Sequence, residues 1–554
     1  MFSLKNLKWN IQEKQHEDIY EDLLLKRSLD LKYLEPLYTD LYDPFLMHHM
    51  KEAVERIQKA VEKKEKILIY GDYDVDGITS TAFLYKSLKK IGADVTYFLP
   101  DRVKDGYGLS SEYAPIFQKE GIHLMITVDT GITNVEEVKV FQQHGMEVIV
   151  TDHHTPLEII PDCIILNPKK KECHYPYKGL VGAGVAYKLV QALSTMYPEI
   201  TETYLKWSLS YIALATVVDC AKLVDENRVI VSLGLLALQK SKEPWIQAMM
   251  EIIQKPQEEI SPRTLGFQIG PRLNAAGRIA SPNTVLEFFL SEDSTEAFKK
   301  AKYLNNLNIQ RQEILIESLE KAEEVKDETQ EVIFAFDPHW NMGVIGLIAG
   351  KLSEKYHKPV FAMTENERKI TGSIRNPIPE INVTDALVAA EKYLDHFGGH
   401  SQAAGFSLLP ENKEKFVEVI KEYMQKNISK ELLQPSIIVD RCIDIKDIDI
   451  SLVEKIQTLS PFGLGNPQPL FCIKNCILSN MKNIGSQSNH FACEVIGEDG
   501  TALRAISFYS PNWLETIQDW KNVDILGRLH INEWNNIKSV QMVLEDIREI
   551  PRGT

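Results

Sequence analysis

Residues 66–77 read KILIYGDYDVDG, an apolar run that ends in a loop with three aspartates. The apolar run predicts a short buried strand, and a helix is expected to follow from Ile78 to Ile91. Asp72, Asp74 and Asp76 stand at alternate positions and would repel one another strongly if no cation lay between them. The segment therefore predicts a strand–loop–helix unit whose loop holds a divalent cation.

The same rhythm continues after this unit. Short apolar segments recur at 95–100, 124–131, 147–154 and 163–168, and helices are expected among them. Strands that alternate with helices indicate a parallel α/β sheet, in which ligands bind beyond the carboxyl ends of the strands. Four clusters of polar residues are expected at such ends: the three aspartates of the first loop, Asp129, Asp152-His153-His154, and Asp219.

The spacing D-x-D-x-D-G also opens the calcium loop of an EF-hand. That loop needs a helix before it and a bidentate Glu at its twelfth position. In this chain a strand is expected before the loop, and the twelfth position is Phe83. Taken alone, Asp129 would be read as a capped turn and His153-His154 as an exposed turn. Together the four clusters favour a site of carboxylate and imidazole ligands, which suits Mn²⁺, or Mg²⁺ in its place, better than a thiolate metal.

Composition limits the classes of protein. A chain of 554 residues predicts three or four domains. The net charge of −16 excludes a protein that coats DNA through a basic surface, but carboxylates gathered around cations count toward that charge, so a metallonuclease is compatible. Seven cysteines without a CxxC pair, no apolar signal-peptide core and no stretch long enough to cross a membrane predict a reduced, cytoplasmic protein.

The rest of the chain suggests further domains. Residues 1–65 have a mostly helical pattern and are expected to pack on the catalytic core, and a long polar helix is expected from 293 to 328. A second α/β unit follows from 329 to 430 and contains the glycine-rich segment FGGHSQAAGF (397–406). From 436 to 554 short alternating strands, two of them joined by an Asp499-Gly500 hairpin turn, predict a small β-barrel. The first α/β unit would then span 66–292.

Three motifs carry a family resemblance: GDYDVDG (71–77), VDTG (128–131) and TDHH (151–154) resemble the defining motifs of the DHH phosphoesterase superfamily. Further segments resemble its single-strand-specific 5′→3′ exonucleases, from about residue 30 onward. They are DGYGLS (105–110), LVGAGVAYKL (180–189), ATVVDCAKL (215–223), GPRLNAAGRI (270–279), MGVIGLIAGKL (342–352), GSIRNP (372–377), GGHSQAAGF (398–406) and PFGLGNPQPLF (461–471).

The resemblance implies a fold and an activity. It implies a parallel-sheet DHH catalytic domain, an α/β DHH-associated domain joined to it by a long helix, and a C-terminal OB-fold barrel that holds single strands. The implied activity is release of 5′-mononucleotides from single-stranded DNA by two-metal hydrolysis, in repair and recombination. The implied partners are single-stranded DNA, a helicase and a single-strand-binding protein, with no membrane, and a monomer is expected. Some family members carry a further C-terminal domain, which this chain is expected to lack.

The resemblance also implies a ligand set. Asp74, Asp129 and Asp72 would hold the first metal; Asp76, Asp129, His153 and Asp219 would hold the second, with Asp129 as the bridge. His153 and His154 join Asp129 as catalytic residues, His154 at the edge of the site against the scissile phosphate. Small DHH phosphoesterases begin the first motif with His where this chain has Tyr70, and Asp72 is expected to replace that ligand.

Phosphate contacts are expected from the second α/β unit and from GPRLNAAGRI. Arginine binds phosphate through a bidentate fork, and glycine lets backbone N–H groups approach. Without the resemblance, Arg375 fits a surface salt bridge and Gly398-Gly399 a tight turn equally well, and Tyr107 could stack on a base or pack in the core. The candidates are Asn274, Arg278, Ser373, Arg375, Gly398, Gly399 and His400.

Two alternatives stay open. A DHH phosphodiesterase for short oligoribonucleotides or cyclic dinucleotides would have the two α/β domains but usually no OB barrel. A non-catalytic replication scaffold would have lost metal ligands, whereas no candidate carboxylate or histidine is missing here once Asp72 is allowed for. The choice of Mn²⁺ or Mg²⁺, of DNA or RNA, and the processivity are not determined by the sequence.

Overall fold

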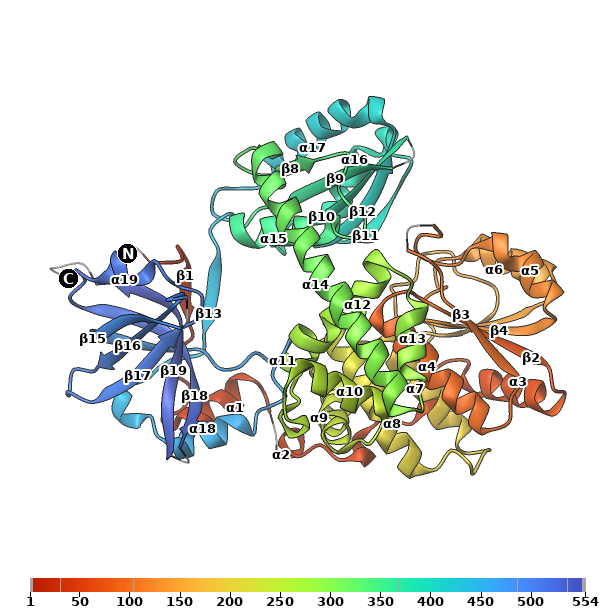
Figure 1. The fold of residues 1–554 in the computed structure, drawn as a ribbon, viewed down its shortest axis with the longest axis horizontal. Helices are drawn as coiled ribbons and strands as arrows, with labels where there is room; N and C mark the ends of the chain where they lie inside the picture. Colours follow the sequence, from red (N-terminus) through yellow and green to blue (C-terminus); the bar gives the residue numbers. More distant parts are fainter. Residues whose placement is uncertain are drawn as a thin grey trace.

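The computed structural model describes residues 3–29, 31–102, 104–366, 368–485, 487–535 and 537–550. Residues 1–2 and 551–554, at the outer ends of the first and last predicted domains, lie outside the described residues. Three larger sheets, each with its own apolar core, follow one another along the chain (Figure 1). No described helix is both long and apolar enough to span a bilayer.

The first sheet is entirely parallel, as its alternating pattern predicts, and β2 is its second strand. Its order is β3 (Val95–Phe98), β2 (Lys66–Gly71), β4 (Ile122–Val128), β5 (Glu147–Thr151) and β6 (Ile164–Leu166). Gly71 pairs with Val128, Val128 with Thr151 and Thr151 with Leu166. Because these strands end in register, the residues that follow them share one edge: Asp72, Asp129, Asp152 and Asn167.

Helix α4 (Val75–Lys90) begins three residues before its predicted start, because Asp74 caps it. The Asp74 side chain accepts a hydrogen bond from the backbone N–H of Gly77 at 3.1 Å. The DHH triplet lies outside β5, which ends at Thr151. The remaining helices of this region are α3 (Met50–Glu62), α5 (Ala114–Lys119), α6 (Val135–Gln143), α7 (Gly182–Leu193), α8 (Glu202–Val218), α9 (Asp225–Lys240), α10 (Pro244–Ile253), α11 (Pro262–Thr264), α12 (Gly270–Ile279) and α13 (Asn283–Phe289).

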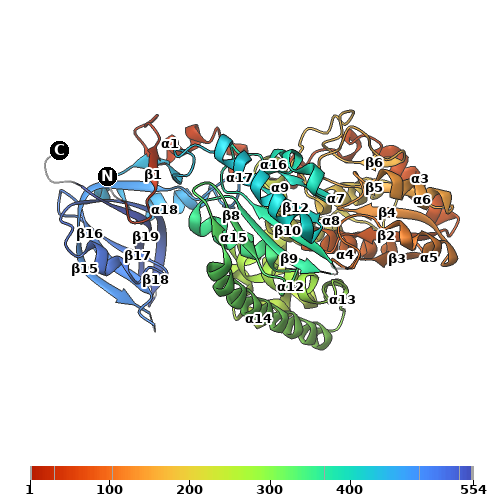
Figure 2. The same cartoon turned by 90° about the horizontal axis from the view of Figure 1, so that it is seen from above.

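Helix α14 (Ser294–Val325) joins the two α/β domains, close to the range predicted for it. The second sheet is mixed, in the order β11 (His396–His400), β12 (Ala403–Leu408), β10 (Lys369–Arg375), β9 (Val360–Asn366), β8 (Ile333–Phe336) and β7 (Asp327–Glu328). Helices α16 (Val383–Ala389) and α17 (Lys413–Asn427) cover one face, and α15 (Ile345–Tyr356) covers part of the other. Figure 2 shows this domain over the region between the barrel and the catalytic sheet.

The third sheet closes on itself, which confirms the predicted OB-like barrel. The strands β15 (Phe471–Ile484), β16 (His490–Ile496), β17 (Ala502–Ser507), β19 (Ile537–Glu549) and β18 (Val523–Trp534) pair in that order, and β15 also pairs with β18. Such closure removes free strand edges. The predicted hairpin turn is present, with Gly500 in the left-handed region at φ 82°. Strands β13 (Ser436–Val439) and β14 (Arg441–Cys442) lead in, and α18 (Ile450–Gln457) and α19 (Trp513–Ile517) cover the barrel.

The N-terminal segment is less helical than its pattern predicts. It contains β1 (Lys8–Ile11), which pairs in parallel with β13, and the helices α1 (Ile19–Lys26) and α2 (Leu31–Leu34). Helix α1 packs on the barrel through Ile19 and Leu23, whereas the later part, with Met47 and α3, packs on the catalytic domain. The first residues thus belong with the last domain rather than with the catalytic core.

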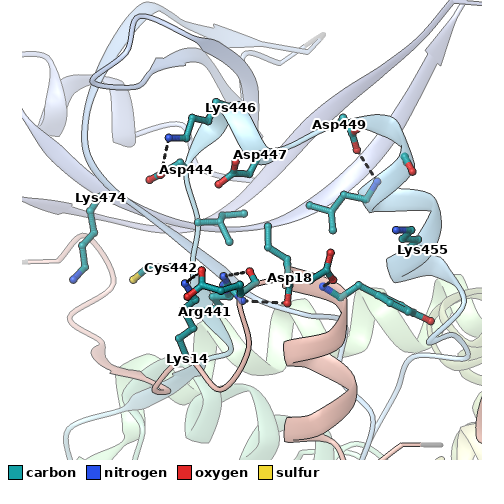
Figure 3. A pocket seen from close by; sticks show the side chains of 16 residues that line it. Lys14, Asp18, Arg441, Cys442, Asp444, Lys446, Asp447, Asp449, Lys455 and Lys474 are labelled. Atoms are coloured by element: carbon teal, nitrogen blue, oxygen red, sulfur yellow. Dashed lines mark hydrogen bonds and ion pairs between the residues drawn. The ribbon is translucent and has the colours of Figure 1, made fainter.

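A surface hollow of about 720 Å³ lies at the joint between α1, β14 and α18 (Figure 3). Arg441 fastens this joint, because its guanidinium donates hydrogen bonds to the carbonyls of His16 and Glu17, each at 2.7 Å. None of the predicted site residues lines the hollow.

Candidate active site

The carboxyl edge of the first sheet gathers the predicted metal ligands. Their ligand atoms form three overlapping groups, each within 4.8 Å. Asp129, directly after β4, belongs to two of these groups, and so does His153. The groups are Asp72, Asp74 and Asp129; Asp76, His153 and Asp219; and Asp129, His153 and His154.

Asp76 is held by the start of α7. Its carboxylate accepts hydrogen bonds from the backbone N–H groups of Gly182 at 2.6 Å and Ala183 at 2.8 Å, where the helix dipole favours negative charge. A Cβ on Gly182 would lie 2.5 Å from Cβ of Asp129, so only glycine lets this helix approach the cluster. LVGAGVAYKL thus positions the second ligand group.

The cluster carries more negative charge than the protein balances. Burial and the Asp74 charge raise the pKa of Asp76 to about 7, and burial with Asp76 and Asp74 raises that of Asp219 to about 8. Burial and neighbouring carboxylates also raise the pKa values of Asp72 and Asp129. One oxygen each of Asp72 and Asp129 is buried without a hydrogen-bond donor among the described residues. These oxygens and this donor set fit hard divalent cations.

His153 lies inside the acid cluster. Its Nε2 is 3.1 Å from Oδ1 of Asp129 and 3.8–3.9 Å from carboxylate oxygens of Asp76 and Asp219. Burial and the neighbouring His154 lower the pKa of His153 to about 3. The ring is therefore neutral, which is the form that coordinates a metal.

His154 lies at the edge, as expected, and Asp152 fixes its ring. The Asp152 carboxylate is 2.8 Å from Nδ1 of His154, and this contact overcomes the effect of burial and raises the pKa of His154 to about 9. The Tyr107 hydroxyl lies 3.1 Å from the same ring, and this tyrosine is half exposed rather than in the core. His154 is thus a protonated, oriented donor at the mouth of the site.

A cluster of arginines lies beside the first motif. Arg278, near the end of α12, has its pKa lowered to about 9 by burial and by the charges of Arg102, Arg311 and Arg375. Within the described residues none of the four forms an ion pair with a carboxylate. Tyr73 joins this cluster to the metal ligands, because its ring lies 5.3 Å from the Arg102 guanidinium. No carboxylate among the described residues therefore neutralises this cluster directly.

The structure divides the predicted phosphate contacts into two groups. Ser373 and Arg375 point from β10 toward the start of α15, where a Cβ on Gly346 would lie 3.1 Å from Oγ of Ser373 and 3.2 Å from Nη2 of Arg375. Arg375 thereby joins Arg278 in the arginine cluster. Asn274 is one helical turn before Arg278 on α12. Gly398, Gly399 and His400 form an exposed edge strand instead, where His400 faces His154.

The sequence does not single out three residues that lie near the site. Arg102, Arg311 and Asp152 carry no distinctive spacing: Arg102 precedes DGYGLS, Arg311 lies in the long polar helix, and Asp152 was grouped with the histidines without a role. Only the fold shows that two of them complete the arginine cluster and that the third orients His154.

Comparison with known proteins agrees with this geometry. Residues 66–216 match the DHH family, N-terminal domain, residues 329–426 the DHHA1 domain and residues 439–546 the RecJ OB domain. The fold and the acid–histidine cluster thus define a metal-dependent phosphodiester hydrolase of the DHH class.

The relatives narrow the class. The single-stranded-DNA-specific exonuclease RecJ of Bacillus subtilis is 34% identical, over 98% of this chain and 70% of the relative. That of Haemophilus influenzae is 30% identical, over 94% of both chains. The structure of RecJ from Thermus thermophilus in complex with Mn²⁺ superimposes with a TM-score of 0.84 at 26% identity, over 99% of this chain and 80% of that one. The chain belongs to the RecJ family.

Proposed function

We propose that this protein removes 5′-mononucleotides from single-stranded DNA in the 5′→3′ direction, by two-metal hydrolysis of phosphodiester bonds. The activity named for the relatives supports the substrate, and the Mn²⁺-bound and Mg²⁺-bound RecJ structures support the cations. The role in repair and recombination, and help from a helicase and a single-strand-binding protein, follow from the same family membership.

The ligand groups support positions for two cations. Asp72, Asp74 and Asp129 would hold one, and Asp76, His153 and Asp219 the other. Asp129, whose Oδ1 lies 3.1 Å from Nε2 of His153, would also bind the second cation. Bound Mn²⁺, or Mg²⁺ in its place, would supply an activated water and stabilise the leaving oxygen.

His154 acts from the protein side. Because Asp152 keeps its ring charged and oriented, His154 would donate a hydrogen bond to a non-bridging oxygen of the scissile phosphate. That contact strengthens as negative charge develops on the oxygen, so it favours the transition state over the bound substrate.

One observation carries the exonucleolytic assignment: an arginine cluster that forms no ion pair with a carboxylate of the described residues adjoins the metal-ligand cluster across Tyr73. A terminal phosphate is a dianion near neutral pH and suits several guanidinium forks better than an internal phosphodiester does. With the terminal phosphate held by Arg278, Ser373 and Arg375, the first phosphodiester falls at the metals, so nucleotides leave one at a time.

The test compares strands that differ only at the 5′ end. The wild-type protein should cleave a 5′-phosphorylated strand about tenfold or more faster than its 5′-hydroxyl counterpart, judged by kcat/KM. Arg375→Met should remove this preference, whereas Lys351→Met, a charge removed from the exposed face of α15, should keep it. Equal rates on the two strands in the wild-type protein would contradict the assignment.

The barrel favours a long strand as substrate over a dinucleotide. OB-fold barrels hold single strands by stacking and basic grooves, and a dinucleotide in the active site would not reach this domain. Cleavage of dinucleotides with no cleavage of long strands would instead support the phosphodiesterase alternative.

A further inference from the structure

Lys169 lies on the loop that follows β6, and the site described so far gives it no role. Its backbone N–H donates a hydrogen bond to Oδ1 of Asn167 at 2.8 Å, and Nδ2 of Asn167 donates to the carbonyl of His154 at 2.9 Å. Asn167 itself follows β6 directly at the carboxyl edge of the sheet. The position of Lys169 is therefore set by the catalytic sheet and by the DHH segment.

The Lys169 ammonium carries a charge that no protein group neutralises directly. Its side chain is exposed, and among the described residues no acceptor lies within hydrogen-bond or ion-pair distance of Nζ. Loss of hydration lowers the pKa of Lys169, and the charges of Asp152 and Asp219 oppose that effect. The adjacent Lys170 is buried instead, with its Nζ 3.3 Å from Nδ1 of His48. Lys169 thus offers a free positive charge at the mouth of the site.

Burial and the charges of His154 and Lys169 lower the pKa of His400, which lies on β11 of the second domain. In the register of the mixed sheet, His400 pairs with Ala403 and Ala403 with Arg375, so His400 and Arg375 share one face, two strand spacings or about 10 Å apart. On the same face, Ser373 pairs across the sheet with Gly405, and Gly405 pairs with Gly398. A Cβ on Gly398 would meet nothing within 4 Å. This face is therefore an open floor with Arg375 toward one end and His400 toward the other.

The two ends of this floor have different electrostatic neighbours. Arg375 is influenced by Arg102, and His400 by His154 and Lys169. In the sheet order, Tyr73 follows β2 and Lys169 follows β6, three strands further along, so the arginine cluster beside Tyr73 and the loop of Lys169 lie toward opposite ends of the carboxyl edge. A DNA strand whose terminal phosphate lies at the arginine cluster would pass over the metal ligands toward Lys169 and His400.

We propose that Lys169, with His400, binds the phosphodiester next to the scissile one on its 3′ side. This inference rests on the proposed function, since it takes the terminal phosphate to be at the arginine cluster. Lysine acts on a phosphate as a point charge and needs no fork geometry, which suits a strand that advances by one nucleotide after each cleavage.

The test uses two 5′-phosphorylated strands that differ only in the second phosphodiester from the 5′ end, one of them carrying a neutral methylphosphonate there. In the wild-type protein the neutral linkage should lower kcat/KM about tenfold. On the normal strand, Lys169→Met should have a kcat/KM about tenfold below that of the wild-type protein. For this variant, the neutral linkage should lower kcat/KM by less than about a further twofold. Its log kcat/KM should also fall less steeply with log salt, by about 0.7.

The controls separate charge from position. Lys171→Met removes the same charge from an exposed site on the same loop and should keep the wild-type penalty, and Lys169→Arg should restore most of the rate. A penalty in Lys169→Met equal to that of the wild-type protein, or no penalty in the wild-type protein, would overturn the inference. If the wild-type protein fails to shorten the unmodified strand from its 5′ end, the proposed function itself fails.

Discussion

Asp129 shows how one residue holds the site together. It belongs to two of the three ligand groups, and its backbone is left-handed at φ 62°, a conformation that Asn and Asp tolerate better than most residues. Its Oδ1 is buried without a hydrogen-bond donor among the described residues, and Gly182 lies directly against its side chain. Asparagine is therefore the substitution that removes the charge while keeping backbone and volume.

We predict opposite effects of Asp129→Asn on activity and stability. Nuclease activity with Mn²⁺ should fall more than about a hundredfold, because both cations lose a ligand. In chelator, the midpoint of thermal unfolding should rise by a few degrees, because a buried, repelled carboxylate is gone. Activity and calorimetry on the same preparations check both, and a lower midpoint in chelator would contradict the electrostatic explanation.

The pH dependence of the metal-free protein follows from Asp76 and Asp219. Their pKa values are about 7 and about 8 in the folded protein, above the ordinary 3.8, so the folded state holds more protons than the unfolded chain between those limits. The free energy of unfolding in chelator should therefore fall as the pH rises from about 4 to about 8. Urea titrations across this range measure it, and Asp219→Asn should flatten the upper part.

Metal ligands were easier to predict than anion contacts. Carboxylates that directly follow apolar strands have a fixed relation to the sheet, so Asp72, Asp129 and His153 could be placed from the sequence. Arg311 has no such relation, because it is one cation on a long polar helix until α12 and β10 lie beside it. A charge becomes a binding residue only through its neighbours, and those come from distant segments.

At the scale of elements, α12 packs against the metal-binding loop GDYDVDG (71–77). A Cβ on Gly277 would lie 2.7 Å from the carbonyl oxygen of Tyr73, so α12 packs directly against the backbone of the metal-binding loop. The same helix carries Arg278, whose Nη1 donates a hydrogen bond to the carbonyl of Gly343 at 2.9 Å. Helix α12 therefore connects the metal ligands, the arginine cluster and the second domain.

We predict that Gly277→Ala lowers kcat/KM about tenfold or more, because the added methyl group must push the metal-binding loop or the helix aside. Gly266→Ala is the matched control: its Cβ would make an ordinary contact of 3.6 Å with Val217, and activity should stay within about twofold. Single-turnover rates with saturating Mn²⁺ test the pair. Equal rates in the two variants would show that the contact with Tyr73 does not matter.

The elements themselves were largely predictable, and the exceptions have local causes. The five strands of the catalytic sheet and the long helix α14 follow from apolar runs and helical periodicity. Strand β1 does not, because its four residues form a strand only by pairing with β13, more than 400 residues away. The glycine-rich 397–406 segment forms a hairpin of two strands rather than a tight turn at Gly398-Gly399, because β12 pairs both with β11 and with β10.

At the scale of the whole molecule, Arg228 fastens the barrel to the catalytic domain. It is buried, and it donates hydrogen bonds to the carbonyls of Tyr33 at 2.7 Å, Leu459 at 2.9 Å and Ser460 at 2.7 Å. The adjoining PFGLGNPQPLF segment packs on the same side, where Leu223 N–H donates to the carbonyl of Leu464. The segment thus braces the barrel against the catalytic domain, an arrangement that no local pattern specifies.

We predict that Arg228→Met loosens this joint and leaves the active site intact. The carbonyls of Tyr33, Leu459 and Ser460 each lose a hydrogen bond from the buried guanidinium, which should cost about 2–4 kcal/mol of stability. Cleavage of a dinucleotide should stay within about twofold, while degradation of a long strand slows about tenfold, because the barrel no longer holds it in line. Lys206→Met, which breaks an exposed pair with Glu202, is the control; equal loss on both substrates would contradict this role.

The measurement that tests the central claim most directly uses one single strand labelled at either end, with Mn²⁺, and compares the wild-type protein with Asp129→Asn. The account predicts that a 5′ label appears at once as mononucleotide, that a 3′ label remains on a shrinking strand, and that the variant does neither. Mononucleotide release from the 3′ end, or equal activity in Asp129→Asn, would contradict it.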